Sequence, residues 1–143
     1  MGHRFIEDIA IADVAFEVYG KTVDELFISA ALALLDTMVK NSEKVRGRVA
    51  VKFLLEADDL DDLLIRFLNH LVLYKDSKSL IFGRFEVCVK QTGERWIVKC
   101  VAHGEKLDEK RHEPRVDVKS ATLHMLEVKK TNGEWCGRVV LDV

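Results

Sequence analysis

Two amphipathic helical segments, set among alternating strand segments, constrain the fold of this chain more than any other feature. The first segment opens at Thr22 and Glu25. In this spacing the Thr hydroxyl can accept a hydrogen bond from the backbone N–H of the third helical residue, and the Glu can reach back. The apolar residues that follow lie on one stripe, and the helix is expected to end near Lys40. The stripe consists of Leu26, Phe27, Ala30, Leu34 and Met38.

The second helical segment begins in a run of aspartates. Asp58 and Asp59 can cap it, and Asp61 and Asp62 are favourable at its positive N-terminal end. Its apolar residues are spaced three and four apart: Leu60, Leu63, Leu64, Phe67, Leu68 and Leu71. Because each helix is apolar on one side only, each needs a sheet or a partner helix to cover that side.

Alternation of apolar and polar residues predicts strands on both sides of the helices. These strands cover residues 14–18, 45–55, 85–89 and 96–100, and two more, 123–129 and 134–142, flank a hairpin signal at Asn132 and Gly133. A polar loop is expected over residues 104–114. The pattern predicts an α+β fold with a largely antiparallel sheet and two amphipathic helices. One Pro and no recognisable linker indicate a single compact domain over residues 1–143.

The charge balance and the cysteines argue against several classes of function. A net charge of −2 and a pI near 6.2 do not suit a dedicated nucleic-acid-binding protein, so no strong nucleic-acid binding is expected. Three cysteines, widely spaced, are too few for a disulfide framework or a zinc site, and are predicted to be free thiols. No signal-peptide pattern and no apolar run of roughly 20 residues is present, so the protein is expected to be cytoplasmic and not bound to membranes.

Two aspartates stand among apolar neighbours near the two ends of the chain. Asp13 heads the first alternating strand, and Asp142 is the penultimate residue, next to the terminal carboxylate of Val143. A carboxylate in such surroundings is costly unless it is paired or binds a metal, although aspartates at strand ends are often simply solvated. Both interpretations remain open at this point. By alternation, Asp142 points away from the face that carries Trp135, Val139 and Leu141.

The other candidate residues form no recognisable catalytic motif. His103, His112 and His124 lack the spacing of a known metal motif, and neither a nucleophile elbow nor a glycine-rich phosphate loop is present. A histidine-based active site and purely structural or exposed histidines are both compatible with the pattern. The aspartates at 58–62 lack the ligand spacing of a calcium loop, so we interpret them as a solvated helix start.

Short motifs at the start, at residues 112–124 and at the end of the chain form a recognisable set. They are Arg4-Phe5-Ile6-Glu7, Ala12-Asp13-Val14, Tyr19-Gly20-Lys21-Thr22, His112-Glu113-Pro114, Val116-Asp117-Val118-Lys119, Thr122-Leu123-His124 and Val140-Leu141-Asp142-Val143. Over essentially its whole length the chain resembles the archease family, small proteins that activate the GTP-dependent tRNA-splicing RNA ligase. Two departures stand out: Ala10 and Ile11 replace the His and Thr that many members carry, and Ser120 stands where Ala is commoner.

The resemblance implies an accessory protein rather than an enzyme. Such a protein promotes formation of the ligase–guanylate intermediate, and so permits repeated turnover and wider nucleotide use. The resemblance also implies a divalent metal bound by Asp13, Asp142 and Val143. Oxygen ligands of this kind suit Ca²⁺ first, with Mg²⁺ or Mn²⁺ as alternatives. His112, Lys119 and His124 are expected to serve the interface with the ligase or to contact the metal ligands.

Two other functions compete with this interpretation. In a free-standing metal-dependent phosphoesterase, Asp13 and Asp142 would hold the metal, and His112 or His124 would act as general acid or base. An RNA-binding chaperone is the third possibility, and the acidic pI weakens it.

Overall fold

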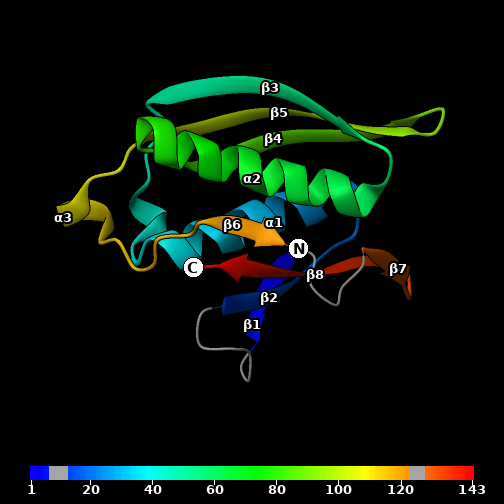
Figure 1. The fold of residues 1–143 in the computed structure, drawn as a ribbon, viewed down its shortest axis with the longest axis horizontal. Coiled ribbons are helices and arrows are strands. Elements are labelled where there is room, and N and C mark those ends of the chain that lie inside the picture. Colours follow the sequence, from blue (N-terminus) through cyan, green and yellow to red (C-terminus); the bar gives the residue numbers. More distant parts are fainter. Residues whose placement is uncertain (7–12, 123–127) are drawn as a thin grey trace.

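The computed structural model describes residues 1–6, 13–122 and 128–143, and it places two long helices between two β-sheets (Figure 1). The long helices are α1 (Val23–Met38) and α2 (Leu60–Lys78), and the short ones are η1 (Ser42–Lys44) and α3 (Glu109–His112). The strands are β1 (Gly2–Ile6), β2 (Asp13–Gly20), β3 (Val49–Ala57), β4 (Leu80–Thr92), β5 (Arg95–Lys106), β6 (Ser120–Thr122), β7 (Lys129–Thr131) and β8 (Glu134–Asp142).

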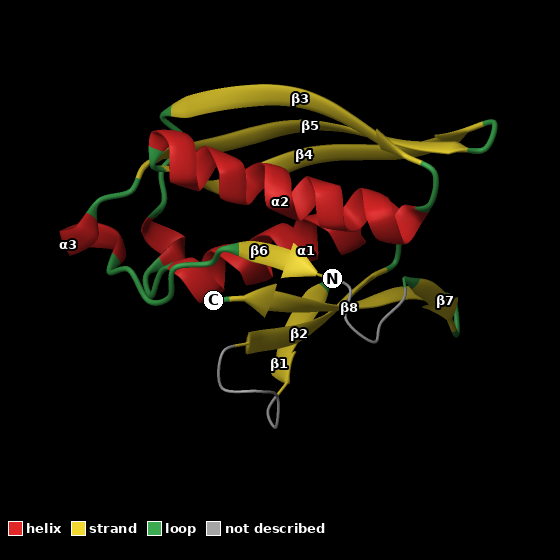
Figure 2. Cartoon of the chain, viewed as in Figure 1, coloured by secondary structure: helices red, strands yellow, loops and turns green. Residues whose placement is uncertain are grey.

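The strands divide between two antiparallel sheets. In the first sheet the order is β1-β2-β8-β6, with β7 paired to one end of β8. In the second sheet the order is β3-β5-β4. Figure 2 shows the helices in the space between the two sheets. The predicted α+β class and the antiparallel pairing are therefore confirmed, and the structure adds that the strands form two sheets.

The α1 helix begins with the predicted capping interactions. The hydroxyl of Thr22 accepts a hydrogen bond from the Glu25 N–H at 3.1 Å, and the Glu25 carboxylate accepts one from the Lys21 N–H at 2.7 Å. The helix ends at Met38, two residues before the expected end, because Val39 is extended and forms a β-bridge with Pro114.

Residues on both flanks of the predicted stripe of α1 are buried as well, whereas Leu32 and Asp36, on the opposite side, are half-buried. Ala31, Ala33 and Leu35 are at most 2% exposed. The small alanines let a neighbouring element approach closely. This burial follows from the position of α1, which contacts β2 of one sheet and β4 of the other.

The α2 helix matches its prediction more closely. Asp59 is its N-cap, and its carboxylate accepts a hydrogen bond from the Asp62 N–H at 2.7 Å. The predicted apolar stripe is buried over its whole length. Asp58 instead forms an ion pair with Arg95 at 2.6 Å, and Asp61 accepts a hydrogen bond from the Val128 N–H. Of the aspartates, Asp59 therefore caps the helix as predicted, whereas Asp58 and Asp61 also contact other segments.

Two segments differ from their predictions. The strand expected from residue 45 begins at Val49, because residues 45–48 leave η1 and cross over to Glu105, which accepts the Arg46 N–H. The polar loop expected over residues 104–114 is partly regular, since β5 continues to Lys106 and α3 follows. The predicted strand over 123–129 lies mostly outside the described residues. The hairpin at residues 132 and 133 is confirmed, with φ of 52° and 77°.

One hydrophobic core joins both sheets and both long helices. Within the described part of the chain, no helix combines the length and the apolar character needed to cross a bilayer. The three cysteines are free thiols, as expected.

Candidate functional site

The two strands that carry the predicted metal ligands Asp13 and Asp142 are neighbours in one sheet. β2 and β8 pair antiparallel, and the register places Asp13 directly opposite Asp142. Side chains of directly opposed residues project to the same face of a sheet, a few ångströms apart. The fold therefore brings together two carboxylates that are 129 positions apart in sequence, counted from their residue numbers.

The surroundings of this pair are partly apolar. Asp13 is half-buried and Asp142 is exposed, whereas the next residues on the same face, Ala15 and Val140, are buried and also lie opposite each other. Leu141 points to the other face and is fully buried in the core. The predicted outward orientation of Asp142 is therefore confirmed. Like charges placed directly opposite each other destabilise a sheet, and a bound cation would offset this repulsion.

The end of β8 is held on its other side by the segment before β6. The Lys119 N–H donates a hydrogen bond to the Asp142 carbonyl at 2.9 Å, and Ser120 pairs with Asp142 in the β6–β8 register. The Lys119 side chain is exposed, while Val143 is half-buried and packs against the core. Asp142 is thus held between β2 and β6, and Val143 follows directly after it.

The donor set at this end of the sheet fits a hard cation. Two carboxylates and a terminal carboxylate are all oxygen donors, as Ca²⁺, Mg²⁺ and Mn²⁺ prefer. Within residues 1–6, 13–122 and 128–143, no three His, Cys, Asp or Glu side chains gather into a metal-binding cluster. A cation here would therefore need ligands beyond Asp13 and Asp142, from Val143, from water or from a partner molecule. The assignment of Asp13, Asp142 and Val143 as ligands stays a prediction.

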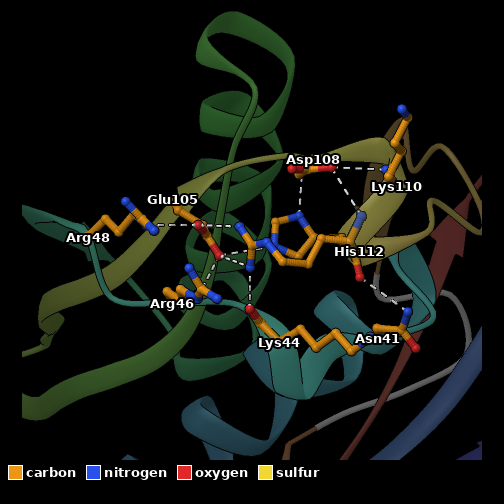
Figure 3. A network of polar contacts seen from close by, with 9 residues as sticks. Asn41, Lys44, Arg46, Arg48, Glu105, Asp108, Lys110 and His112 are labelled. Carbon is orange, nitrogen blue, oxygen red and sulfur yellow. Dashed lines mark hydrogen bonds and ion pairs between the residues drawn. The ribbon is translucent and has the colours of Figure 1, made fainter.

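His112 lies in a second polar cluster, which Figure 3 shows in detail. Its side chain is fully buried. The ring Nδ1 accepts a hydrogen bond from the Asp108 N–H at 2.8 Å, and Nε2 lies 3.0 Å from the Glu105 carboxylate. Because a backbone N–H can only donate, the ring proton resides on Nε2 and is donated to Glu105. His112 can therefore influence an interface only through the groups around it.

Glu105 is the centre of this cluster. Its carboxylate accepts two hydrogen bonds from the Arg111 guanidinium, at 2.6 and 2.7 Å, and one from the Arg46 N–H at 2.7 Å. The side chain is nearly fully buried. The Arg111 bonds, with those from Arg46 and His112, lower the pKa of Glu105 from 4.5 to about 2. Asp108 caps α3 by accepting the N–H groups of Lys110 and Arg111, and the Arg111 N–H contributes most to lowering the Asp108 pKa.

Main-chain hydrogen bonds connect this cluster to the carboxylate pair. After α3, the Glu113 carbonyl accepts the Lys40 N–H and the Arg115 N–H donates to the Met38 carbonyl, both at 2.8 Å. The segment then reaches Lys119 and its bond to Asp142. Residues 107–119 therefore form a strap from the Glu105 cluster to the end of β8. We call these residues the connecting segment.

The remaining predicted histidines are not part of this arrangement. His103 lies on β5 and contacts the Glu86 carboxylate at 2.7 Å. His124 falls outside the described residues. The sequence reasoning missed Glu105, Arg111 and Arg46, because nothing in a polar stretch marks one Glu as buried. The one available signal was the position of Glu105, which comes after the small strand residues Ala102 and Gly104.

The fold and the site together define the class of this protein: a small α+β domain with two long helices between antiparallel sheets, and a carboxylate pair on its second and last strands. The model of the Archease protein family (MTH1598/TM1083) matches residues 3–143. The chain therefore belongs to the archease family.

Individual relatives agree with this assignment. The archease of Pyrococcus furiosus is 36% identical over 133 residues, which cover 92% of this chain and 93% of that protein. The archease of Aeropyrum pernix is 38% identical, with 92% of each chain covered. Among solved structures, protein 1598 of Methanobacterium thermoautotrophicum has a TM-score of 0.85 at 30% identity over 99% of both chains. An archease of Thermotoga maritima, described as a possible chaperone, shares the fold with a TM-score of 0.63 at 20% identity over 98% of both chains.

Proposed function

We propose that this protein is a cytoplasmic accessory protein that activates the GTP-dependent tRNA-splicing RNA ligase, by promoting guanylation and turnover of the ligase. Membership of the archease family supports this proposal. The description of the Thermotoga maritima relative as a possible chaperone also points to a protein that assists another.

The observation that carries the proposal is the direct pairing of Asp13 with Asp142. Two facing carboxylates and the adjacent terminal carboxylate of Val143 are suited to hold one divalent cation, with Ca²⁺ preferred and Mg²⁺ or Mn²⁺ possible. When bound, the cation supplies positive charge that can neutralise phosphate oxygens. β2 and β8 hold both carboxylates on one face of the sheet, and the exposed Lys119 is bonded to the Asp142 carbonyl through its main-chain N–H.

The competing phosphoesterase needs a histidine that can transfer a proton. His112 cannot present a free ring nitrogen, because both nitrogens are engaged and the side chain is fully buried. The geometry therefore removes His112 from the acid–base role, and the phosphoesterase alternative would depend on His124, which falls outside the described residues.

The test is a guanylation assay with purified ligase, GTP and a divalent cation. We expect wild-type protein to increase the rate at which the ligase–guanylate forms, and the Asp13→Asn and Asp142→Asn variants to lose this effect. Calorimetric titration with Ca²⁺ should show a parallel loss of binding. Asp58→Asn is the matched control, because it makes the same chemical change at an aspartate that is 86% exposed and lies at the start of α2.

Two results would contradict the proposal. One is a guanylation rate no higher than that of the ligase alone. The other is full stimulation by both Asn variants, which would remove the carboxylate pair from the mechanism even if the protein proved to be an activator.

A further inference from the structure

We propose that a groove at the end of the second sheet docks an acidic, partly apolar segment of a partner protein. The groove has a volume of about 1100 Å³. It is formed by residues 46–51 at the start of β3, by the end of α2, and by residues 105–111 around α3. We call it the basic groove.

Cationic side chains dominate the basic groove. They are Arg46, Arg48, Lys78, Lys106 and Arg111, and they face two carboxylates, Glu105 and Asp108. Both carboxylates are already committed within the protein, Glu105 to Arg111 and Asp108 to the first N–H groups of α3. A surplus of positive charge therefore remains at the groove, although the whole chain has a net charge of −2.

Two of the cations have nothing to neutralise them. Within the described residues, the guanidinium of Arg46 and the ammonium of Lys106 have no hydrogen bond or ion pair. Both residues are exposed. Arg46 contacts Glu105 through its main-chain N–H alone, so its side chain remains available. Exposed cations of this kind complement a partner with negative charge.

Arg111 differs from the other cations of the groove, because its side chain is held in one position by hydrogen bonds. The guanidinium binds both oxygens of Glu105 and donates to the Lys44 carbonyl at 2.6 Å, and its side chain is 25% exposed. A side chain held in this way loses little conformational freedom when a ligand binds. The groove therefore has one preorganised cation, Arg111, and exposed cations beside it, of which Arg48 also lies 3.5 Å from the Glu105 carboxylate.

The apolar part of the lining favours a protein segment over RNA. Val49, Val51, Leu80 and Leu107 line the same groove, and Val49 is 42% exposed. A peptide with acidic and apolar residues can cover these side chains while its carboxylates meet the cations. A nucleic-acid strand would bring phosphates and bases, and among the described lining residues no aromatic ring is available to stack on the bases.

The position of the groove relates it to the carboxylate pair. In Figure 1 the start of β3, the end of α2, α3 and the C-terminus lie toward the same end of the molecule. The connecting segment leads from the groove to Asp142. A partner seated at the carboxylate pair could therefore extend a segment into the groove. The inference does not depend on which protein that partner is, so it can be tested without the ligase.

The test measures fluorescence anisotropy of a short labelled peptide in which Glu and Leu alternate. It is compared with a peptide in which Lys and Leu alternate, and with a single-stranded RNA that has the same negative charge as the Glu–Leu peptide. The groove variant combines Arg46→Glu with Lys106→Glu. The control variant combines Lys52→Glu with Lys99→Glu, the same pair of charge reversals on the outer face of the β3-β5-β4 sheet, away from the groove.

We expect the acidic peptide to bind wild type and the control variant alike, and the groove variant about tenfold more weakly, because two attractive contacts become repulsive. Binding should weaken as salt is raised. Thermal unfolding must show that the groove variant is folded. If it is not, Arg46→Gln with Lys106→Gln removes the charges without reversing them, and should also weaken binding.

Three results would overturn the proposal. They are no binding of the acidic peptide to wild type, equal binding by the groove and control variants, and tighter binding of the RNA that is lost in the groove variant. The last result would assign the groove to nucleic acid. None of these measurements involves the carboxylate pair, so the basic groove and the proposed activation can fail independently.

Discussion

Replacing Glu105 by Gln should be the most informative single change, because it keeps the shape of the side chain and removes its charge. In the native protein this carboxylate accepts hydrogen bonds from Arg111, Arg46 and His112, the longest of them 3.0 Å. Gln has one acceptor oxygen, and its amide N–H₂ would face at least one of these donors. Arg111 would then lose its anionic partner.

The expected loss of stability can be estimated from these contacts. Removing one partner of a buried ion pair costs about 3–5 kcal/mol, and a hydrogen bond to a charged group contributes about 1.5–3 kcal/mol. Arg111 is 25% exposed, so water can partly replace its lost partner. We therefore expect Glu105→Gln to lower the free energy of unfolding by about 2–4 kcal/mol, which corresponds to a decrease in Tm of about 6–12 °C for a chain of this size.

The effect should depend on pH in a defined direction. The pKa of Glu105 in the folded protein is about 2, below its ordinary value of 4.5. A carboxyl group with a lowered pKa stabilises the fold fully above its unfolded-state pKa, and this contribution disappears as the pH falls toward the folded-state pKa. The difference in stability between wild type and Glu105→Gln should therefore be constant above about 4.5, and should shrink as the pH falls toward about 2.

The assay is urea unfolding, followed by circular dichroism, at neutral pH and in steps through the acidic range. Glu86→Gln is the matched control, since Glu86 also pairs with a histidine on a strand but is 62% exposed. The control should show a clearly smaller change, because exposed pairs contribute little. The reasoning would be refuted by equal effects of the two substitutions, or by a Glu105→Gln difference that stays the same at every pH.

Three further predictions concern the carboxylate pair and the helix starts. Deleting Asp142 and Val143 should abolish Ca²⁺ binding, measured by calorimetry, and ligase activation, measured by the guanylation assay. A C-terminal tag should impair activation more than an N-terminal tag when both tagged forms are compared at equal concentration. Full activity of the truncated protein would refute the assignment of Asp142 and Val143 as metal ligands. Lys119→Ala should reduce activation without changing Tm, because it removes an exposed positive charge from the residue bonded to Asp142 and leaves the main-chain bond in place. Unchanged stimulation at limiting ligase would show that the side chain is dispensable. Asp59→Ala should lower the free energy of unfolding by about 1 kcal/mol through loss of the α2 N-cap, whereas Asp58→Ala should have a smaller effect; equal denaturation midpoints would contradict this.

Sequence alone determined the features that depend on near neighbours along the chain. The caps at Thr22 and Asp59 and the hairpin at residues 132 and 133 each involve residues at most four apart, so their patterns can be read directly. The buried stripe of α2 was predictable for a related reason, because one helical face meets one apolar surface.

Tertiary structure decided everything that depends on which distant segments meet. The pairing of Asp13 with Asp142 is a matter of strand register, and a shift of one residue would place the two side chains on opposite faces. Burial of α1 beyond its predicted stripe follows from its place between two sheets. The Glu105 cluster gathers main-chain and side-chain donors from residues 46, 111 and 112, and no local pattern specifies that meeting.

His112 illustrates the boundary between the two kinds of information. The sequence placed it in one of the motifs by which the chain resembles the archease family, and this indicated that His112 matters without showing what it does. The structure shows it fully buried, with both ring nitrogens engaged at the root of the connecting segment. Whether a histidine faces solvent or the interior depends on how segments that are far apart in the chain pack together. A short motif contains only the residues near the histidine, so it cannot show whether the side chain will be buried.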